Sequence, residues 1–297
     1  MQMLDISGVL AGGAGVLAAA GVESARVDAE ILLAHSLGID RNALKVQALL
    51  GAALPDDVSG QFDALIAQRA ERVPLQHLTG IAHFRNLTLR VGPGVFIPRP
   101  ETEVVAGAAI AEVQRLQVIQ QGSRPVVIDL CTGSGAIALA VATETSAEVH
   151  AIELDAQAHQ WAHLNIAALA PPGNPIDLRR GDARIPPPDL TNKVDVVVSN
   201  PPYIPPGAVP RDQEVRDHDP AQALYGLGAD GLTVPQGIIE AAAKLLKPGG
   251  LLIMEHGDEQ GPATRNLAAK AGYIEIETKK DLTDRDRYLT ARRPPPR

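Results

Sequence analysis

Apolar positions recur with a helical period between about residues 5 and 72 of the chain. In segment 25–37 the apolar side chains fall on one face of the predicted helix, whereas Asp28 and Glu30 fall outside that face. The positions on the apolar face are Val27, Ile31, Leu32 and Ala34. Because such faces are buried against other helices, the pattern predicts a helical bundle.

Proline marks the end of this helical region. A further helix is predicted to begin near Asp56 and Asp57, and it ends before Pro74 because a proline cannot continue it. No strand-like alternation is found before that point. Residues 1–80 are therefore predicted to form a small helical domain.

The next segment changes to the period of two that is typical of strands. The apolar residues that alternate with polar ones are Phe84, Leu87, Leu89 and Val91. They are followed by Gly92-Pro93-Gly94 and the apolar run 95–97, so the pattern predicts a β-hairpin with its turn at 92–94. Residues 81–100 are expected to join two domains, and a helix is expected to begin near Glu101.

From residue 125 short apolar runs alternate with helical segments. Strands are predicted at 126–130, 147–152, 176–178, 194–198, 251–255, 273–277 and 287–291. Helices are predicted between them at 136–143, 156–169, 235–246 and 258–270. This alternation indicates a doubly wound α/β fold, in which helices cover both faces of a mostly parallel sheet. Ligands bind such sheets beyond the carboxyl ends of the strands, so the domain at 101–297 is expected to carry the site.

Composition and charge narrow the class of protein. Of the 297 residues 45% are apolar and 3% aromatic, which indicates a globular core of small aliphatic side chains. A net charge of −8, with five basic against nine acidic residues in the first 80, argues against direct nucleic-acid binding. The single cysteine excludes an intramolecular disulfide and a cysteine-based zinc site, and no metal is expected. The apolar stretch 9–22 is too short to span a bilayer, so we expect a cytoplasmic protein that does not bind membranes.

A glycine loop follows the first predicted strand of the sheet. Its glycines let a ligand approach the backbone closely, but dinucleotide-binding folds place glycines at the same point. Asp129, ahead of the glycines, is more typical of methyltransferases, whose ligand carries an ammonium group rather than a pyrophosphate. The loop therefore favours S-adenosylmethionine. The residues expected to contact it are Asp129, Cys131, Thr132, Gly133, Ser134 and Gly135.

Two acidic residues follow the next strands. Glu153 can accept hydrogen bonds from both hydroxyl groups of an adenosine ribose, or it can be a charge at the start of a helix, although Asp155 is better placed as a cap. Asp182, followed by Ala183, can face the adenine amino group or form a turn. Glu153, Asp182 and Ala183 are thus candidate cofactor-binding residues.

The most informative segment is Asn200-Pro201-Pro202-Tyr203, which follows the strongly apolar strand at 194–198. The two prolines end strand pairing and fix their own φ angles, so the bend is rigid. The Asn200 side chain and the Pro201 carbonyl group can then act as paired acceptors for a planar NH2 group, with Tyr203 against that plane. All four residues are predicted to be catalytic, and Asn200 also to lie against the cofactor.

An amide nitrogen is a poor nucleophile because its lone pair is delocalised into the carbonyl group. Hydrogen bonds from its protons to the two acceptors would raise the electron density on nitrogen, and alignment with the methyl donor would supply proximity. The proton can leave after positive charge has formed on nitrogen. We therefore assign no general base.

The chain resembles the release-factor glutamine methyltransferase family, also called HemK or PrmC. The matching segments, in family order, are Pro74-Leu-Gln-His-Leu-Thr-Gly80, Phe96-Ile-Pro-Arg-Pro-Glu-Thr-Glu103, Asp129–Gly135, Asn200-Pro-Pro-Tyr-Ile204, Leu246-Lys-Pro-Gly-Gly250 and Glu255-His-Gly-Asp-Glu-Gln260. The resemblance implies an enzyme with a class I methyltransferase-like, seven-stranded sheet, and we expect a monomer. It also implies that the helical domain docks a peptide chain release factor and that the N5 amide nitrogen of the glutamine in its Gly-Gly-Gln motif is methylated.

Some positions depart from the family pattern. Cys131 replaces a glycine, which is tolerated if the position does not require a positive φ, and it is expected to be a small packing residue. Glu153 stands where many relatives have Asp, and His77 where Tyr is common. His159 and His163 share a helix face, but no third ligand accompanies them, so a solvated face is expected rather than a metal site.

Two other functions remain open from the residues alone. Asn-Pro-Pro-Tyr also suits an enzyme that methylates the amino group of adenine in a nucleic acid, or a glutamine of another translation protein. A non-catalytic module that merely binds the cofactor would have no need of this bend. The residues Phe96, Arg99 and Glu101 can line the site or pin the connection between the domains.

Overall fold

The computed structural model describes residues 5–120 and 124–296. These residues form two compact units. The helical unit contains the described residues up to Ile81 together with Pro210–His218. The sheet unit contains Ala82–Val209 and the described residues from Asp219 onward. Segment 210–218 therefore packs with residues that lie far earlier in the sequence.

The helical unit is built from short helices around an apolar core. They are α1 (Ile6–Ala19), α2 (Ala25–Leu37), α3 (Arg41–Leu49), α4 (Asp56–Ala70), α5 (Leu75–Thr79) and α9 (Gln213–His218). The side chains of Asp5 and Asp40 accept backbone N–H groups in the first turns of α1 and α3, which satisfies donors that have no partner inside the helix. Leu10, Leu32 and Phe62 are among the fully buried side chains of the core.

The predicted apolar face of α2 was wrong at three positions. Val27 is 38% exposed, whereas Asp28 and Glu30 are buried. Their carboxylates have cationic partners: Arg69 donates to Asp28 over 2.8 Å, and Arg41 approaches Glu30 to 2.7 Å. A buried carboxylate is tolerated where it is paired and hydrogen-bonded. These partners come from other helices, so the periodicity within α2 did not reveal them.

The hairpin lies at its expected place in the chain, but its turn does not. Its strands are β1 (Ile81–Phe84) and β2 (Leu87–Arg90), and the turn between them places Arg85 at a φ of 52°. A turn does form at the predicted place, where the N–H of Val95 donates to the Gly92 carbonyl oxygen over 3.4 Å, but it follows the hairpin and does not join its strands. A Cβ on Gly92 would lie 2.6 Å from the ring of Trp161. Phe84 and Leu87 are three residues apart, so the period of two is interrupted between them. This interruption marks the turn of the hairpin.

The sheet unit is organised around a seven-stranded sheet with the order β5-β4-β3-β6-β7-β9-β8. Its strands are β3 (Val126–Leu130), β4 (Glu148–Glu153), β5 (Ile176–Arg180), β6 (Val194–Ser199), β7 (Leu246–Glu255), β8 (Ile274–Lys280) and β9 (Asp286–Arg292). The pairings from β5 to β7 are parallel, and β9 is antiparallel to both of its neighbours. The expected mostly parallel, seven-stranded α/β sheet is thus confirmed.

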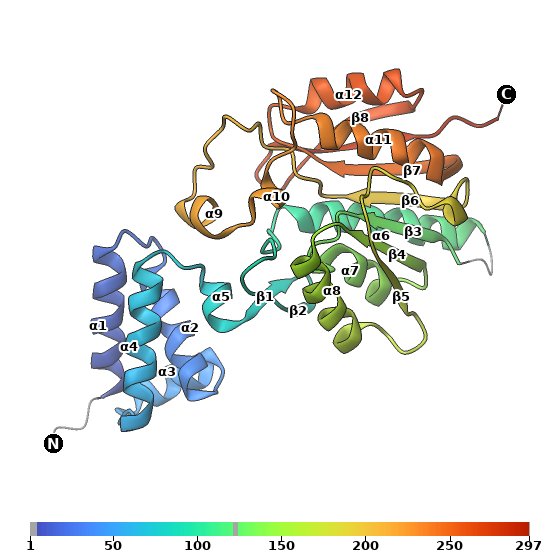
Figure 1. Cartoon of the computed structure of the whole chain (residues 1–297). Helices are drawn as coiled ribbons and strands as arrows, with labels where there is room; N and C mark the ends of the chain where they lie inside the picture. Colours follow the sequence, from blue (N-terminus) through green and yellow to red (C-terminus); the bar gives the residue numbers. More distant parts are fainter. Residues whose placement is uncertain (1–4, 121–123, 297) are drawn as a thin grey trace. The chain divides into compact units, whose positions relative to one another are not determined.

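Helices cover both faces of this sheet (Figure 1). On one face lie α6 (Thr102–Ile119), α7 (Ala136–Glu144) and α8 (Ala156–Leu169), and on the other lie α11 (Thr233–Leu245) and α12 (Gly261–Lys270). Short helical segments are η1 (Pro188–Leu190) and α10 (Ala221–Leu224). Along β6, Val196 and Val198 belong to one apolar core and Val197 to the other. Burial on both sides explains why the strand is apolar except for Asp195 and the terminal Ser199.

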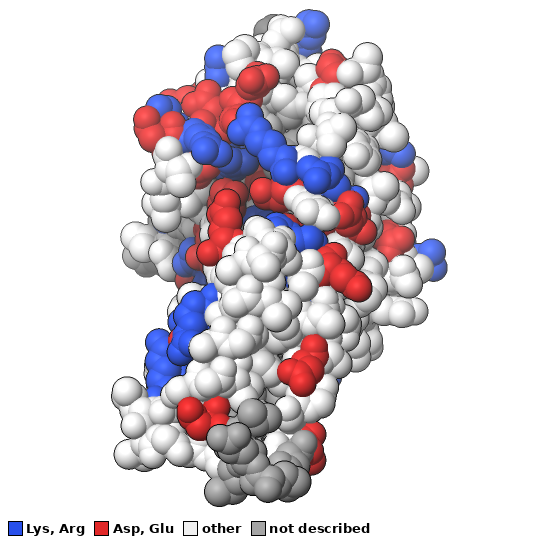
Figure 2. Space-filling model, turned by 90° about the vertical axis from the view of Figure 1, so that its left-hand side faces the viewer, with Lys and Arg blue, Asp and Glu red and all other residues white. Residues whose placement is uncertain are grey.

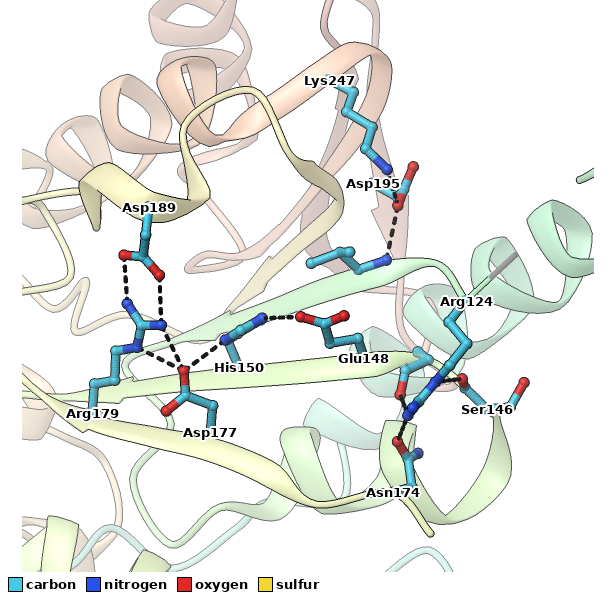
Figure 3. A network of polar contacts seen from close by, with 12 residues as sticks. Arg124, Ser146, Glu148, His150, Asn174, Asp177, Arg179, Asp189, Asp195 and Lys247 are labelled. Carbon is cyan, nitrogen blue, oxygen red and sulfur yellow. Dashed lines mark hydrogen bonds and ion pairs between the residues drawn. The ribbon is translucent and has the colours of Figure 1, made fainter. Parts of the chain in front are cut away.

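A polar network stabilises the sheet away from the glycine loop (Figure 3). Near the amino ends of the strands, the buried Asp195 accepts hydrogen bonds from the N–H of Val126 and the ammonium group of Lys247, at 2.8 and 2.7 Å. His150 of β4 lies between Glu148 and Asp177, 3.0 Å from each. Among the described residues, no helix combines the length and the apolar character needed to cross a membrane.

Candidate active site

The loops singled out in the sequence follow neighbouring strands at the carboxyl edge of the sheet. Leu130 at the end of β3 is paired with Ile152 of β4 on one side and with Ser199 of β6 on the other. Ser199 is also paired with Met254 of β7. Because parallel strands end at the same edge, the glycine loop, Glu153 and Asn200 begin side by side.

The glycine loop leads directly into α7. Gly133 and Gly135 have φ angles of 58° and 84°, a region that glycine adopts without a steric penalty. A Cβ on Gly133 would meet no atom within 4 Å, so this part of the backbone borders open space. Ser134 is held by Asn165 of α8, whose side chain donates to the Ser134 carbonyl oxygen over 2.9 Å. The sequence analysis did not identify Asn165.

Asp129 is fully buried below the loop. Its Oδ2 accepts hydrogen bonds from the Thr132 hydroxyl at 2.5 Å and from the N–H of Ala138 at 3.1 Å. Its Oδ1 is buried without a hydrogen-bond partner among the described residues. Burial, with a smaller contribution from the charge of Glu153, raises the pKa of Asp129 to about 7. A buried acceptor with unused capacity is suited to an ammonium group or to a bridging water.

Glu153 lies beside the glycine loop and is hydrogen-bonded to its backbone. One carboxylate oxygen accepts the N–H of Gly133 and the other the N–H of Asp155, each at 2.8 Å. Asp155 itself caps α8. Burial raises the pKa of Glu153, although these backbone hydrogen bonds counteract the rise. Because a carboxylate has about four lone-pair sites, both oxygens can still accept further hydrogen bonds.

Cysteine in place of glycine at position 131 was expected to be tolerated if the backbone there does not require a positive φ. This condition is not met. The φ of Cys131 is 65°, in the left-handed region that is costly for a residue with a Cβ. The side chain is partly buried and packs against the core between the sheet and α11. Burial raises the pKa of the Cys131 thiol, so it is protonated at neutral pH. These observations agree with a packing role, at a strained backbone position.

Asp182 forms a local turn. Its Oδ1 accepts the N–H of Arg184 at 2.9 Å, and the Arg184 guanidinium group pairs with the same carboxylate at 2.6 Å. This interaction lowers the pKa of Asp182. Ala183 is buried in the core on the α11 side of the sheet. Of the two interpretations given above for Asp182, these contacts favour turn formation.

The segment Asn200–Tyr203, here called the proline bend, is held by side chains from two other elements. The Nδ2 of Asn200 donates to the Thr102 hydroxyl oxygen at the start of α6 over 3.2 Å. The Tyr203 hydroxyl donates to Oε1 of Glu255 at the end of β7 over 3.3 Å. The other carboxylate oxygen of Glu255, Oε2, is buried without a hydrogen-bond partner among the described residues. Because the Nδ2 atom of Asn200 is hydrogen-bonded to Thr102, the amide oxygen of Asn200 points away from Thr102.

The backbone of the proline bend lies against glycines. A Cβ on Gly226 would lie 2.7 Å from the Pro202 carbonyl oxygen, and one on Gly231 would lie 2.3 Å from that of Tyr203. The Gln260 side chain donates to the Tyr203 carbonyl oxygen over 2.9 Å. Side chains larger than hydrogen at the two glycine positions would displace the bend, so segment 226–231 is part of its support.

Thr102, Glu255 and Gln260 were quoted as part of the family resemblance, but no role was predicted for them. Glu255 could have been identified from the sequence, because it lies at the end of a buried strand, as Glu153 does. Thr102 carries no comparable signal. Its contact with Asn200 spans 98 residues and depends on how α6 packs against the sheet.

The residues before α6 form a compact group. The guanidinium group of Arg99 lies 4.9 Å from the ring centre of Phe96 and pairs with Asp219 at 2.5 Å. Glu101 occupies the N-cap position of α6 without a side-chain capping hydrogen bond, and its charge contributes to raising the pKa of Glu255, for which burial is the largest cause. Within the described ranges, no cluster of three or more metal-binding side chains occurs.

Two parts of the chain match models of known protein families. Residues 9–80 match the model of the PrmC N-terminal domain, and residues 87–212 match that of the methyltransferase small domain. A Streptomyces coelicolor protein named release factor glutamine methyltransferase is 45% identical over 93% of this chain and 94% of its own length. The protein of the same name from Mycolicibacterium smegmatis is also 45% identical, with the same coverage. That from Mycobacterium tuberculosis H37Rv is 41% identical over 98% of this chain and 91% of its own length.

Proposed function

We propose that this chain transfers a methyl group from S-adenosylmethionine to the side-chain amide nitrogen of a glutamine in a peptide chain release factor. The chain belongs to the release factor glutamine methyltransferase family, and this membership supports the proposal. The glutamine we propose is that of the Gly-Gly-Gln motif. The observation that carries the proposal is the orientation of Asn200: its NH2 group is bound by Thr102, which directs its amide oxygen elsewhere as an acceptor.

The residues around the glycine loop fit the cofactor. The buried Oδ1 of Asp129 provides unused acceptor capacity of the kind that an ammonium group requires. The open space beside Gly133 allows close approach to the backbone, and Glu153 retains lone pairs for ribose hydroxyls. When bound, S-adenosylmethionine supplies an electrophilic methyl group on a sulfonium centre. We assign its binding to Asp129, Glu153 and the loop through Gly135, and give Asp182 the smaller role of shaping a turn.

The proline bend orients the substrate amide. The Asn200 side-chain oxygen and the Pro201 carbonyl group can accept the two protons of the glutamine NH2 group, while Tyr203 lies against the amide plane. Two acceptors withdraw the protons from nitrogen and so raise its nucleophilicity. Fixed acceptors also lower the entropic cost of reaching the reactive geometry.

The helical unit is the proposed docking surface for the release factor, because residues 9–80 match a domain model specific to this family. We further infer a monomer that acts in the cytoplasm, where release factors work. Methylation of adenine in a nucleic acid is less well supported. The net charge is −8, and on the face drawn in Figure 2 Lys and Arg side chains lie beside Asp and Glu side chains.

Labelling of a purified release factor with radioactive S-adenosylmethionine tests the function directly. The full chain should label the release factor, and a Gln→Ala change in its Gly-Gly-Gln motif should abolish the signal. Asn200→Ala serves as the inactive-enzyme control. Equal labelling of the Gln→Ala substrate would refute methylation at that glutamine, and labelling only of nucleic acid would favour the alternative.

Two variants separate cofactor binding from chemistry. Asn200→Ala should lower the turnover rate by roughly a hundredfold or more, because a polar contact at the reacting centre is lost. Its dissociation constant for S-adenosylmethionine should stay within severalfold of wild type. Glu153→Ala should show the reverse, with weaker cofactor binding in calorimetry and a turnover that recovers at saturation. If the two variants exchange these patterns, the assigned roles are wrong.

A further inference from the structure

We propose that Gln260 is a positioning residue for the proposed methyl transfer. Its side-chain amide holds the backbone carbonyl group of Tyr203 and so fixes the end of the proline bend. The inference rests on the proposed function, because the bend is the element that receives the substrate amide. Gln260 itself has no contact with the substrate in this proposal and acts only through Tyr203.

The side chain of Gln260 joins three segments at the carboxyl edge of the sheet. Its Nε2 atom donates to the carbonyl oxygen of Tyr203 over 2.9 Å and to that of Asp230 over 3.2 Å. Its Oε1 atom accepts the N–H group of Gly257 over 2.9 Å. The proline bend, segment 226–231 and the connection between β7 and α12 therefore meet at one side-chain amide.

Only one orientation of the Gln260 amide satisfies these partners. An amide NH2 group has two protons to donate, whereas the amide oxygen can only accept. The carbonyl oxygens of Tyr203 and Asp230 use both protons, and the Gly257 N–H group uses the oxygen. In the reversed orientation an oxygen would face two carbonyl oxygens, and NH2 would face an N–H group. The donor is therefore fixed in its direction towards Tyr203.

The Gln260 side chain is also held close to its own backbone. The N–H group of Gln260 donates to the Gly257 carbonyl oxygen over 2.9 Å, and the Gly257 N–H group donates back to the Gln260 side chain over the same distance. The Gln260 carbonyl oxygen accepts the N–H group of Thr264 in α12 over 2.9 Å. These bonds restrict a side chain that would otherwise have many rotamers. Gln260 thus forms a rigid extension of the start of α12.

The proline bend is fixed at both of its ends. At its start, Ser199 is paired with both neighbouring strands, and its hydroxyl group donates to the Leu130 carbonyl oxygen over 2.6 Å. The two prolines that follow have restricted φ angles. With the carbonyl group of Tyr203 held by Gln260, the Pro201 carbonyl group between these ends is left with a single direction. A shift of the Tyr203 carbonyl group would turn that acceptor away from the substrate amide.

Gln260→Glu isolates the contact with Tyr203. A carboxylate keeps an acceptor for the Gly257 N–H group but places its second oxygen against the carbonyl oxygens of Tyr203 and Asp230. With an intact release factor at pH 8, kcat should fall by about tenfold or more, because a displaced acceptor no longer holds the reactive geometry. The dissociation constant for S-adenosylmethionine should stay within about twofold of wild type, since the glycine loop is unchanged. A kcat equal to that of wild type would overturn the proposal.

Gln260→Met removes the donor without adding a charge. Its kcat should also fall, but less than that of Gln260→Glu, because the repulsion between oxygens is missing. The KM for the release factor should change less than kcat, since the bend orients the reacting amide rather than docking the partner. Calorimetric titration with S-adenosylmethionine counts the folded molecules, so kcat is expressed per binding site. A purely structural role predicts a lower melting temperature with an unchanged kcat per site, and that result would refute the proposal.

Nuclear magnetic resonance reports on the hydrogen bond itself. With ¹³C in the tyrosine carbonyl groups and ¹⁵N in the isoleucine amides, the peptide groups that carry both labels are Tyr203-Ile204 and Tyr273-Ile274. In Gln260→Met the signal of Tyr203-Ile204 should move. The signal of Tyr273-Ile274 should stay, because Tyr273 follows the opposite end of α12. Two unmoved signals in a variant that has lost activity would show that Gln260 does not act through Tyr203.

Gln236→Met is the matched control, since Gln236 is an exposed glutamine in α11 that donates to Glu240. It should leave both kcat and the Tyr203-Ile204 signal unchanged. A wild-type protein that labels no glutamine refutes the proposed function, and the inference with it. If wild type labels glutamine and both Gln260 variants turn over at the same rate as wild type, the inference alone is refuted.

Discussion

At the scale of single residues, Cys131 shows how a cofactor loop tolerates a residue that its backbone disfavours. Its φ of 65° is that of the glycines further along the same loop, which lie at 58° and 84°. A side chain in this region costs on the order of 1–2 kcal/mol. Packing of the small Cys131 side chain against the core offsets part of this cost. A large side chain would not be tolerated at this position.

Replacing Cys131 tests this strain without the complication of the thiol. Cys131→Gly and Cys131→Ala both remove it, but only Ala keeps the Cβ at positive φ. We expect the glycine variant to be more stable than the alanine variant by about 1 kcal/mol, which reverses their usual order. The measurement is the free energy of unfolding in urea, and an alanine variant of equal or higher stability would show that the position is not strained.

At the scale of elements, the proline bend depends on a segment that contributes no catalytic group. Gly226 and Gly231 allow backbone to pass directly against Pro202 and Tyr203. The parallel bridge between Ile204 and Tyr225 closes the same arrangement. Rigidity within the bend comes from its prolines, but its position against the sheet comes from these contacts.

A single methyl group should be enough to disturb that support. Gly231→Ala places a Cβ 2.3 Å from the Tyr203 carbonyl oxygen at a φ of 74°. We expect kcat to fall at least tenfold, with cofactor affinity retained, because the bend shifts and the glycine loop does not. Gly207→Ala, in the same long connection but with no atom within 4 Å of the added Cβ, is the control and should behave as wild type. Similar activity of the two variants would show that the bend can relax.

At the scale of the whole molecule, the helical unit includes nine residues from the connection between β6 and α11, 210–218. Glu214 in α9 forms ion pairs with Arg69 in α4, at 2.9 Å, and with Arg72 just after α4, at 2.8 Å. Arg69 also pairs with the buried Asp28 of α2, so one guanidinium group joins three segments. The connection that follows the proline bend is therefore part of the core structure of the helical unit.

The ionisation of Glu214 makes this attachment dependent on pH. Burial alone would raise the pKa of Glu214, but hydrogen bonds from Arg72, its own backbone and Arg69 outweigh that effect and lower it to about 2. A depressed pKa stabilises the folded state above the ordinary value near 4.3, and this stabilisation is lost as pH falls towards 2. We expect Glu214→Gln to be less stable at pH 7 by no more than about 3 kcal/mol, given the partial exposure of the side chain.

Urea unfolding of wild type and Glu214→Gln at several pH values measures this contribution. The stability difference should be constant above pH 5 and should narrow between pH 4 and 2, while Glu240→Gln, an exposed helical carboxylate, should show little effect at any pH. A difference that widens on acidification would assign the stabilisation to another group.

Much of the fold and of the candidate site could be predicted because the signals are local. Strongly apolar runs such as 126–130 and 194–198, each interrupted by one Asp, identify buried parallel strands without knowledge of their neighbours. Once a parallel sheet is inferred, the glycine loop and the proline bend must meet, since all carboxyl ends lie at one edge. The family resemblance rests on the same short segments and is confirmed by relatives that cover nearly the whole chain.

The sequence by itself therefore determined the order of the elements, the type of sheet and the edge at which the chemistry is placed. Only the tertiary structure decided that Asp28 is buried, that Cys131 has a positive φ, and that Thr102 and Glu255 are hydrogen-bonded to Asn200 and Tyr203, respectively. The physical reason is that hydrophobic periodicity is set by neighbours along the chain. The partner of a buried polar group, in contrast, is set by packing between residues far apart in sequence, such as Thr102 and Asn200.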